Sequence, residues 1–461
     1  MLFERLLVFG LAFGAFSFGA VYPWGYWPIG GLALALGLWA LRHPAPDPDR
    51  SFRTLTVALI AVATAIALQA VPLPRSIFLA LAGGAERFLQ QHDVGYAFQP
   101  PGTHTLSLDP VATFTTLALF GAFSVLLLGL SRGSADARLD RIVRSLVFLG
   151  VVMATAGIVQ RAAVPPRGAH LVYGFWEPQF KGDPFGPFIN RNHFAGWMLL
   201  ALPLAMGYSL AVLHRHRPPL NSGIRQWLRW LITPDASRFA FVMLAVLVMG
   251  TSLALTQSRS GIVGFLAAVL VLAVAMCRHA RRPFVRALVL SYAGVLAGGA
   301  LLWAGLATTL TRFSLTAADL PARWSAWQDT LRIIADFPLF GVGLGNYGLA
   351  MLIYQTGHRS TMFAQAHNDY LQLLAEGGIL VVIPALACFV VIARLIRRRL
   401  DGHDESPYEY WIRVGAVAAL VGIALQSLVE FSLQMPANAL LFVVVLAIAI
   451  RPRLRAHAHR V

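Results

Sequence analysis

The chain has 461 residues, of which 57% are hydrophobic and 13% charged, and its mean hydropathy is +0.65. Soluble domains carry about 25% charged and about 45–50% apolar residues, so this composition excludes an ordinary soluble enzyme and a disordered protein. Lys and Arg number 37 against 21 Asp and Glu, which gives a net charge of +16. Such an excess suggests nucleic-acid binding in a soluble protein, but basic residues also orient membrane segments.

Twelve apolar runs predict spanning helices, because a helix of about 20 apolar residues crosses a hydrocarbon core of about 30 Å. In chain order the runs lie at 2–20, 26–41, 55–71, 112–130, 146–164, 194–213, 239–255, 262–277, 287–307, 379–396, 414–428 and 437–450. Twelve spans place both termini on one side, and most Lys and Arg residues flank that side, so the termini are expected in the cytoplasm. We predict an all-α integral membrane protein, with residues 1–461 forming one polytopic domain and no nucleic-acid partner.

Three segments outside the cytoplasm are long enough for function: 72–110, 165–192 and 308–378. The last is a large loop between the ninth and tenth spans. Pro321 suits the first turn of a helix, and apolar residues follow at helical spacing as far as Phe337 and Pro338. Such an amphipathic helix is expected to lie along the membrane surface, although a helix that only covers the bundle fits the pattern equally well.

A first polar cluster stands just before the sixth span and contains Asn190, Arg191, Asn192 and His193. If the helix begins near Asn192, its free N–H groups and its dipole favour an anion there. Arg191 adds a full positive charge. An interfacial anchor capped by an Asn is the structural alternative.

A second cluster, at 256–261, forms a very short turn between the seventh and eighth spans and includes Gln257 and Arg259. A short turn fixes Arg259 at the membrane surface. A guanidinium at that depth can grip a lipid-linked phosphate with two hydrogen bonds. It can also simply extend toward lipid headgroups.

The third cluster, at 365–378, precedes the tenth span. Asn368 or Asp369 can cap a short helix that ends at the pair Gly377 and Gly378. His367 would then stand at the helix start and face the aqueous side, where an imidazole can act as a general base. A purely structural histidine is the alternative.

Other patterns exclude competing chemistries. Glu430 is the clearest charge near the membrane interior, whereas a proton relay normally needs more than one such group. The run at 336–346 departs from GxGxxG, since Asn346 stands where the third Gly belongs, so a dinucleotide site is not expected. His and Cys residues show no metal-ligand spacing, so neither a metal nor another cofactor is predicted.

Together these segments resemble the O-antigen ligase and polymerase superfamily of bacterial membrane glycosyltransferases. The pieces that carry the resemblance lie in the family's order at 188–196, 258–261, 323–327, 338–346 and 367–372. The resemblance implies a lipid-donor (GT-C type) glycosyltransferase architecture in the bacterial inner membrane, with its site on the periplasmic face. It also implies a glycan donor on undecaprenyl pyrophosphate. The acceptor would be a sugar hydroxyl of lipid A–core in a ligase, a growing glycan in a polymerase, or a protein hydroxyl in an O-oligosaccharyltransferase.

The residues suit such a donor, because negative charge develops on the departing pyrophosphate and preplaced arginines stabilise it. We expect Arg191 and Arg259 to clamp the pyrophosphate, with Arg323 nearby, and His367 to take the proton of the attacking hydroxyl. Attack opposite the leaving group would invert the anomeric centre without a metal. Second-tier candidates are Gln257, Asn190, Asn192 and His193 toward the donor, and Asn368, Asp369 and Tyr370 toward the acceptor.

The preferred interpretation is an O-antigen ligase that works among membrane lipids. A polymerase and a protein O-oligosaccharyltransferase remain open, because they need the same donor chemistry. A lipid-glycan flippase would show a continuous polar path and often an internal repeat, neither of which is apparent. A structural subunit would explain the spans but not polar motifs gathered on one face.

Overall fold

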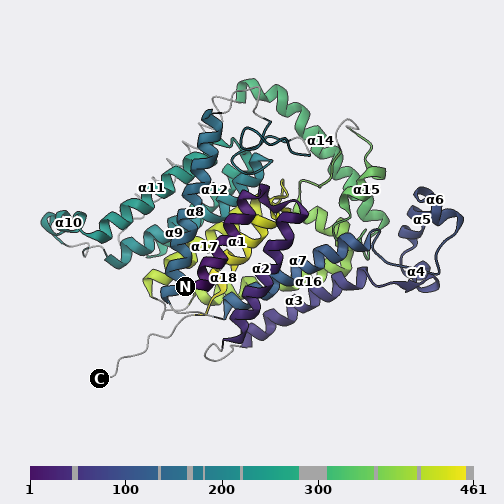
Figure 1. Cartoon of the computed structure of the whole chain (residues 1–461), viewed down its shortest axis with the longest axis horizontal. Helices are drawn as coiled ribbons and strands as arrows, with labels where there is room; N and C mark the ends of the chain where they lie inside the picture. The colour runs from purple at the N-terminus through teal and green to yellow at the C-terminus, as the bar shows by residue number, and fades with distance from the viewer. Residues whose placement is uncertain are drawn as a thin grey trace.

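The computed structural model describes residues 1–43, 50–132, 136–163, 170–179, 182–216, 218, 222–279, 309–357, 362–401 and 406–452. It is a helical bundle with one two-stranded sheet in this part of the chain (Figure 1). Nine of the described helices are long and apolar enough to cross a membrane. They are α2 (Pro23–Arg42), α3 (Arg50–Gln69), α7 (Pro110–Ser131), α8 (Asp136–Ala163), α9 (Arg191–His216), α11 (Pro234–Leu255), α12 (Arg259–His279), α16 (Asp369–Leu400) and α17 (Pro407–Gln426).

The predicted all-α membrane class is confirmed. Two further predicted spans are shorter helices of 15 residues each, α1 (Leu2–Phe16) and α18 (Pro436–Ile450). The predicted span at 287–307 lies outside the described residues. The total of twelve spans therefore stays a prediction.

Helix α9 occupies the centre of the bundle. In its most apolar stretch of 18 residues 83% are buried, whereas in that of α16 only 17% are buried. Its closest neighbour is α17. At their crossing a side chain on Gly207 would come within 2.5 Å of the Trp411 carbonyl oxygen, and one on Gly415 within 2.8 Å of the Pro203 oxygen. Small residues permit such close backbone approach between membrane helices. This contact fixes the relative position of α9 and α17, whose ends carry the candidate site.

The bundle has two ends. The start of α1, the start of α8, the start of α17 and the end of α18 lie together at one of them, which we call the terminal end. Side-chain bonds join them: Arg141 with Glu4, Tyr408 with Asp140, and Arg413 with the Ala449 carbonyl. At the opposite end, the site end, α9 and α12 begin.

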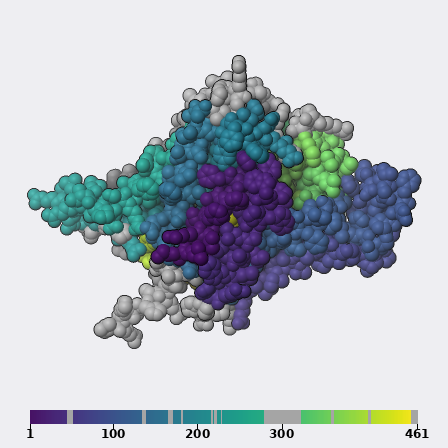
Figure 2. Space-filling model, viewed as in Figure 1, coloured from purple at the N-terminus to yellow at the C-terminus, as the bar shows by residue number. Residues whose placement is uncertain are grey.

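Short elements cover part of the bundle. Strands β1 (Leu73–Pro74) and β2 (Thr103–His104) pair antiparallel and enclose α4 (Arg75–Leu81), α5 (Gly83–His92) and α6 (Val94–Phe98). With α14 (Thr309–Asp336) and α15 (Tyr347–Tyr354) they share a second hydrophobic cluster that includes Phe78, Ile333 and Tyr347. Figure 2 shows this part extending from one side of the bundle, while α10 (Ile224–Leu231) extends from the other.

One helix start was predicted wrongly. Helix α14 ends at Asp336, close to the predicted end, but begins at Thr309 rather than near Pro321. A proline inside a helix removes one backbone hydrogen bond and crowds the carbonyl four residues earlier, but a helix held by other contacts can continue through it at that cost. A proline therefore favours a helix start without requiring one.

Candidate functional site

A buried carboxylate lies at the centre of the candidate site. Glu430 stands between α17 and the short 3-10 helix η3 (Ser432–Gln434), and its side chain is 2% exposed. Its Oε1 accepts hydrogen bonds from Asn192 Nδ2 at 2.7 Å and from Arg323 Nη2 at 2.8 Å. Its Oε2 lies 3.5 Å from His367 Nδ1. Four separate segments therefore meet at one side chain.

The charge of this carboxylate is compensated locally. Arg323 also donates from Nη1 to the Val429 carbonyl at 2.8 Å, so its guanidinium is held at two points. Burial alone would raise the pKa of Glu430, but the contact with His367 and the charge of Arg323 outweigh burial and hold that pKa below its usual range. Glu430 is thus an ionised acid whose charge is balanced inside the site.

The backbone of His367 adopts the left-handed region, with φ of 51°. A residue other than glycine there is strained, and such strain gathers at functional sites. Neighbouring bonds hold the conformation. Trp327 Nε1 donates to the Ala366 carbonyl at 2.9 Å, and the Ala366 N–H donates to Gln372 Oε1 at 3.0 Å. Asn368 Oδ1 then caps α16 by accepting from the N–H groups of residues 370 and 371.

The ring of Phe431 lies between two imidazoles. It packs edge-on against His367 at 4.7 Å and against His193 at 4.6 Å between ring centroids. The His193 side chain is buried, while that of His367 is 23% exposed. Only His367 of the two thus presents an imidazole toward the outside of the bundle.

The start of α9 is tied to the segment that carries Glu430. The Asn192 carbonyl accepts from Gln426 Nε2 at 3.0 Å and from Ser432 Oγ at 3.2 Å, and the His193 carbonyl accepts from Asn438 at 3.0 Å. Asn190 Oδ1 accepts from the Asn192 N–H at 2.8 Å, as expected of a helix-capping Asn. These polar side chains thus hold the backbone at the start of α9 in place.

The two predicted clamp arginines stand at neighbouring helix starts. Arg191 Nη1 pairs with Asp183 Oδ2 at 3.0 Å, and Asp183 is 63% exposed. Arg259 is the first residue of α12 and is exposed, two residues after Gln257, which has φ of 54°. A side chain on Gly261 would come within 2.8 Å of Ala195 Cβ, so α12 and α9 begin side by side.

Two of the predicted acceptor residues bond the end of α17 and the segment that follows it. Asp369 accepts from Gln434 Nε2 at 3.3 Å, and its N–H donates to the Ser427 carbonyl at 2.9 Å. The half-exposed Tyr370 donates to the Ala424 carbonyl at 2.9 Å. The glycine pair behaves as predicted: Gly378 has φ of 55° and breaks α16 after its first turns.

The glycine-rich run at 338–346 is a structural loop. The buried Gln69 donates to the carbonyls of Phe340 at 2.6 Å and Glu376 at 2.9 Å. Asn346, the residue that breaks the dinucleotide pattern, donates to Ser107 Oγ at 2.8 Å. A side chain on Gly341 would meet the Glu376 carbonyl at 2.2 Å, so only glycine fits there. The loop thus locks α14 and α16 together.

Sequence reasoning missed Glu430 as a partner of the site. Its signal was a lone charge near the outer end of a predicted span, and the structure places it just after α17. Phe431, which packs on both imidazoles, carried no polar signal at all. The structure brings Arg323, Asn192 and His367 onto Glu430, and it sets Arg191 and Arg259 at adjacent helix starts.

Part of the chain matches a known protein family. Residues 244–386 match the family model described as O-antigen ligase. No curated protein matches the chain. The matched range includes Arg259, Arg323 and His367, whereas Asn192 and Glu430 lie outside it. The matched family is one of glycosyltransferase-like membrane enzymes of the ligase or polymerase type. Residues 244–386 are thus similar to the O-antigen ligase family, in agreement with the resemblance that the sequence motifs carry.

Proposed function

We propose that this protein is an O-antigen ligase that transfers a glycan from undecaprenyl pyrophosphate to a sugar hydroxyl of lipid A–core. The observation that carries the proposal is the partly exposed imidazole of His367 beside the buried carboxylate of Glu430. His367 also lies within the range that matches the family model. The site end then faces the periplasm of a bacterial inner membrane, with the termini in the cytoplasm.

His367 acts as the general base in this scheme. Its Nδ1 lies 3.5 Å from Glu430 Oε2, so we assign Nε2 to the acceptor hydroxyl. The hydroxyl oxygen bonds to the anomeric carbon while its proton passes to Nε2, and the bond from that carbon to the pyrophosphate oxygen breaks. The carboxylate stabilises the imidazolium that forms, as an orienting acid does in other base-assisted transfers. Attack opposite the leaving group inverts the anomeric centre.

The leaving pyrophosphate takes up the electron pair, and Arg191 and Arg259 stabilise its charge most in the transition state. Arg323 supports the site in a different way. Because both of its terminal nitrogens bond Val429 and Glu430, we assign it a positioning role toward the His367–Glu430 pair. The arginines supply the positive charge, so the proposed reaction needs no metal.

The test is transfer by the purified protein in liposomes that contain undecaprenyl-pyrophosphate-linked glycan. Lipid A–core, a growing lipid-linked glycan and a protein are offered as separate acceptors. We expect a product on lipid A–core, and a loss of about 10²–10⁴-fold for His367→Ala, the usual contribution of a general base. His92→Ala, at an exposed histidine at the end of α5, is the matched control and should transfer normally.

Two results would contradict the proposal. Normal transfer by His367→Ala would remove the mechanism. Product only on the growing glycan, or only on the protein, would replace the ligase by a polymerase or an O-oligosaccharyltransferase of the same superfamily.

A further inference from the structure

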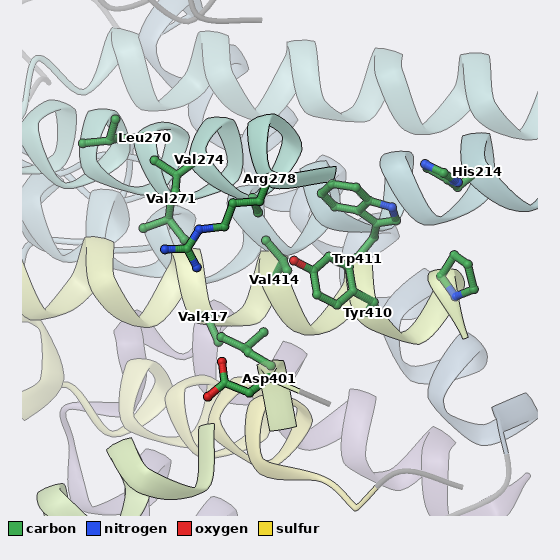
Figure 3. A pocket seen from close by; sticks show the side chains of 13 residues that line it. His214, Leu270, Val271, Val274, Arg278, Asp401, Tyr410, Trp411, Val414 and Val417 are labelled. Atoms are coloured by element: carbon green, nitrogen blue, oxygen red, sulfur yellow. The ribbon is translucent and has the colours of Figure 1, made fainter. Parts of the chain in front are cut away.

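A groove of about 640 Å³ lies at the terminal end of the bundle, far from Glu430 along each helix that forms it. Figure 3 shows the side chains that line it. Helix α12 lines it with Leu270, Val271 and Val274, and α17 lines it with Val414 and Val417. Its polar side chains are Arg278 in the last turn of α12, Asp401 after α16, His214 near the end of α9, and Tyr410 in the first turns of α17. The groove is therefore apolar along its length and polar at one end.

The depth of the groove matches one leaflet of a bilayer. Along α12 it runs from Arg278 to Leu270, a rise of about 12 Å at about 1.5 Å per residue. Half of a hydrocarbon core is about 15 Å. Both α12 and α17 are long and apolar enough to span a membrane, so the groove wall is at acyl-chain depth. A molecule with a polar head near Arg278 and an apolar tail along the valines would fit both the polar end and the apolar wall of the groove.

The polar end of the groove carries one arginine, Arg278. Arg278 is exposed, and no hydrogen bond or ion pair joins its guanidinium to another residue in the part of the chain that the structure describes. Figure 3 shows it reaching from α12 into the space above α17. The one acid of the lining, Asp401, lies 3.5 Å from Arg397 and so has its own counter-ion. His214 stacks on Trp411 with ring centroids 5.9 Å apart.

We propose that this groove binds an anionic phospholipid of the surrounding bilayer, with the phosphate on Arg278 and one acyl chain along Val271, Val274 and Val414. A guanidinium holds a phosphate through charge-assisted, often paired hydrogen bonds. The apolar wall recognises the chain by contact alone. This lipid site is separate from the proposed glycan-transfer site and does not depend on it.

The test is native mass spectrometry of the full-length protein during stepwise addition of phosphatidylglycerol or phosphatidylcholine. We expect wild type to bind phosphatidylglycerol more tightly, and Arg278→Gln to weaken that binding about tenfold, the effect of losing one charge-assisted hydrogen bond. Val274→Trp fills the groove and should abolish tight binding of either lipid. Arg394→Gln is the matched control, since Arg394 is exposed on α16 and outside the groove.

A thermal measurement guards against misfolded variants. A ligand that binds only the folded state raises the unfolding temperature, so phosphatidylglycerol should stabilise wild type and Arg394→Gln more than Arg278→Gln. Equal binding by Arg278→Gln and Arg394→Gln would overturn the proposal. Equal affinity of wild type for the two lipids would contradict the proposed preference for an anionic headgroup. Retention of tightly bound lipid by a folded Val274→Trp protein would show that lipid sits elsewhere.

Discussion

Two arginine–carboxylate pairs stand at opposite ends of the bundle. At the site end, Arg323 lies 2.8 Å from Glu430, and their side chains are 27% and 2% exposed. At the terminal end, Arg397 lies 3.5 Å from Asp401, and their side chains are 85% and 68% exposed. The chemical groups are the same and only the environment differs. The distribution of basic residues in the sequence predicts the cytoplasmic side, whereas the candidate site contains a charge that the fold has buried.

Burial decides what such a pair contributes. An exposed pair is worth about 0.2–1 kcal/mol, because water and salt screen it. Removing one partner of a buried pair costs about 3–5 kcal/mol, because the other charge is left uncompensated. The two pairs therefore predict different responses to the same type of substitution.

The largest effect is expected for Arg323→Ala. It leaves the Glu430 carboxylate, which is 2% exposed, without its guanidinium, and we expect the free energy of unfolding to fall by about 3 kcal/mol. The measurement is equilibrium unfolding of the protein in lipid nanodiscs.

The double variant Arg323→Ala/Glu430→Gln separates charge from packing. A neutral amide needs no cation, so the double variant should be more stable than Arg323→Ala alone. If instead the two substitutions destabilise additively, uncompensated charge is not the cause.

The next effect concerns glycan transfer by Glu430→Gln. The amide can keep Asn192 in place through its oxygen but cannot stabilise an imidazolium at His367. We expect kcat to fall about 10–100-fold with little change in KM for the lipid-linked donor, because the charge interaction develops only in the transition state. Steady-state transfer rates measure this. A rise in KM at unchanged kcat would instead place Glu430 in donor binding.

A pH series on the same variant tests the state of the carboxylate. The pKa of Glu430 is lowered in the folded protein, so its stabilising contribution is present above the ordinary glutamate pKa of about 4.3 and is lost as pH falls through the lowered value. The difference in unfolding free energy between wild type and Glu430→Gln should therefore shrink only when the pH falls below about 4.3, the ordinary glutamate pKa. A difference that shrinks already above pH 6 would mean a raised pKa.

Local sequence signals predicted helix ends well. Helix α9 begins at Arg191, next to the predicted start near Asn192, and Asn368 caps α16 as predicted. Arg259, which we expected in the turn at 256–261, is instead the first residue of α12. A cap or a short turn is specified by neighbours in sequence, so such features are readable there. The helix start predicted near Pro321 was wrong, because a proline is compatible both with a helix start and with a helix interior that other contacts support.

Local sequence signals could not predict that Asn192, Arg323 and His367 contact Glu430. Asn192 and Arg323 stand 238 and 107 positions away from it along the chain. Only the close crossing of α9 with α17 and the locked loop before α16 bring these segments together. The range that matches the family model, 244–386, also excludes Asn192 and Glu430. Motifs within that range therefore identify Arg323 and His367 but not their two partners.

The smallest effect is expected for Arg397→Ala, which repeats the arginine deletion at the terminal end. Both side chains of the Arg397–Asp401 pair are mostly in solvent, so we expect a loss of less than about 0.5 kcal/mol. The loss should vanish at 1 M salt, where the screening length is about 3 Å, while that of Arg323→Ala should persist. The same nanodisc unfolding experiment measures both. If Arg397→Ala costs as much as Arg323→Ala, burial does not distinguish the two ends, and the assignment of Glu430 as the organising charge of the site fails with it.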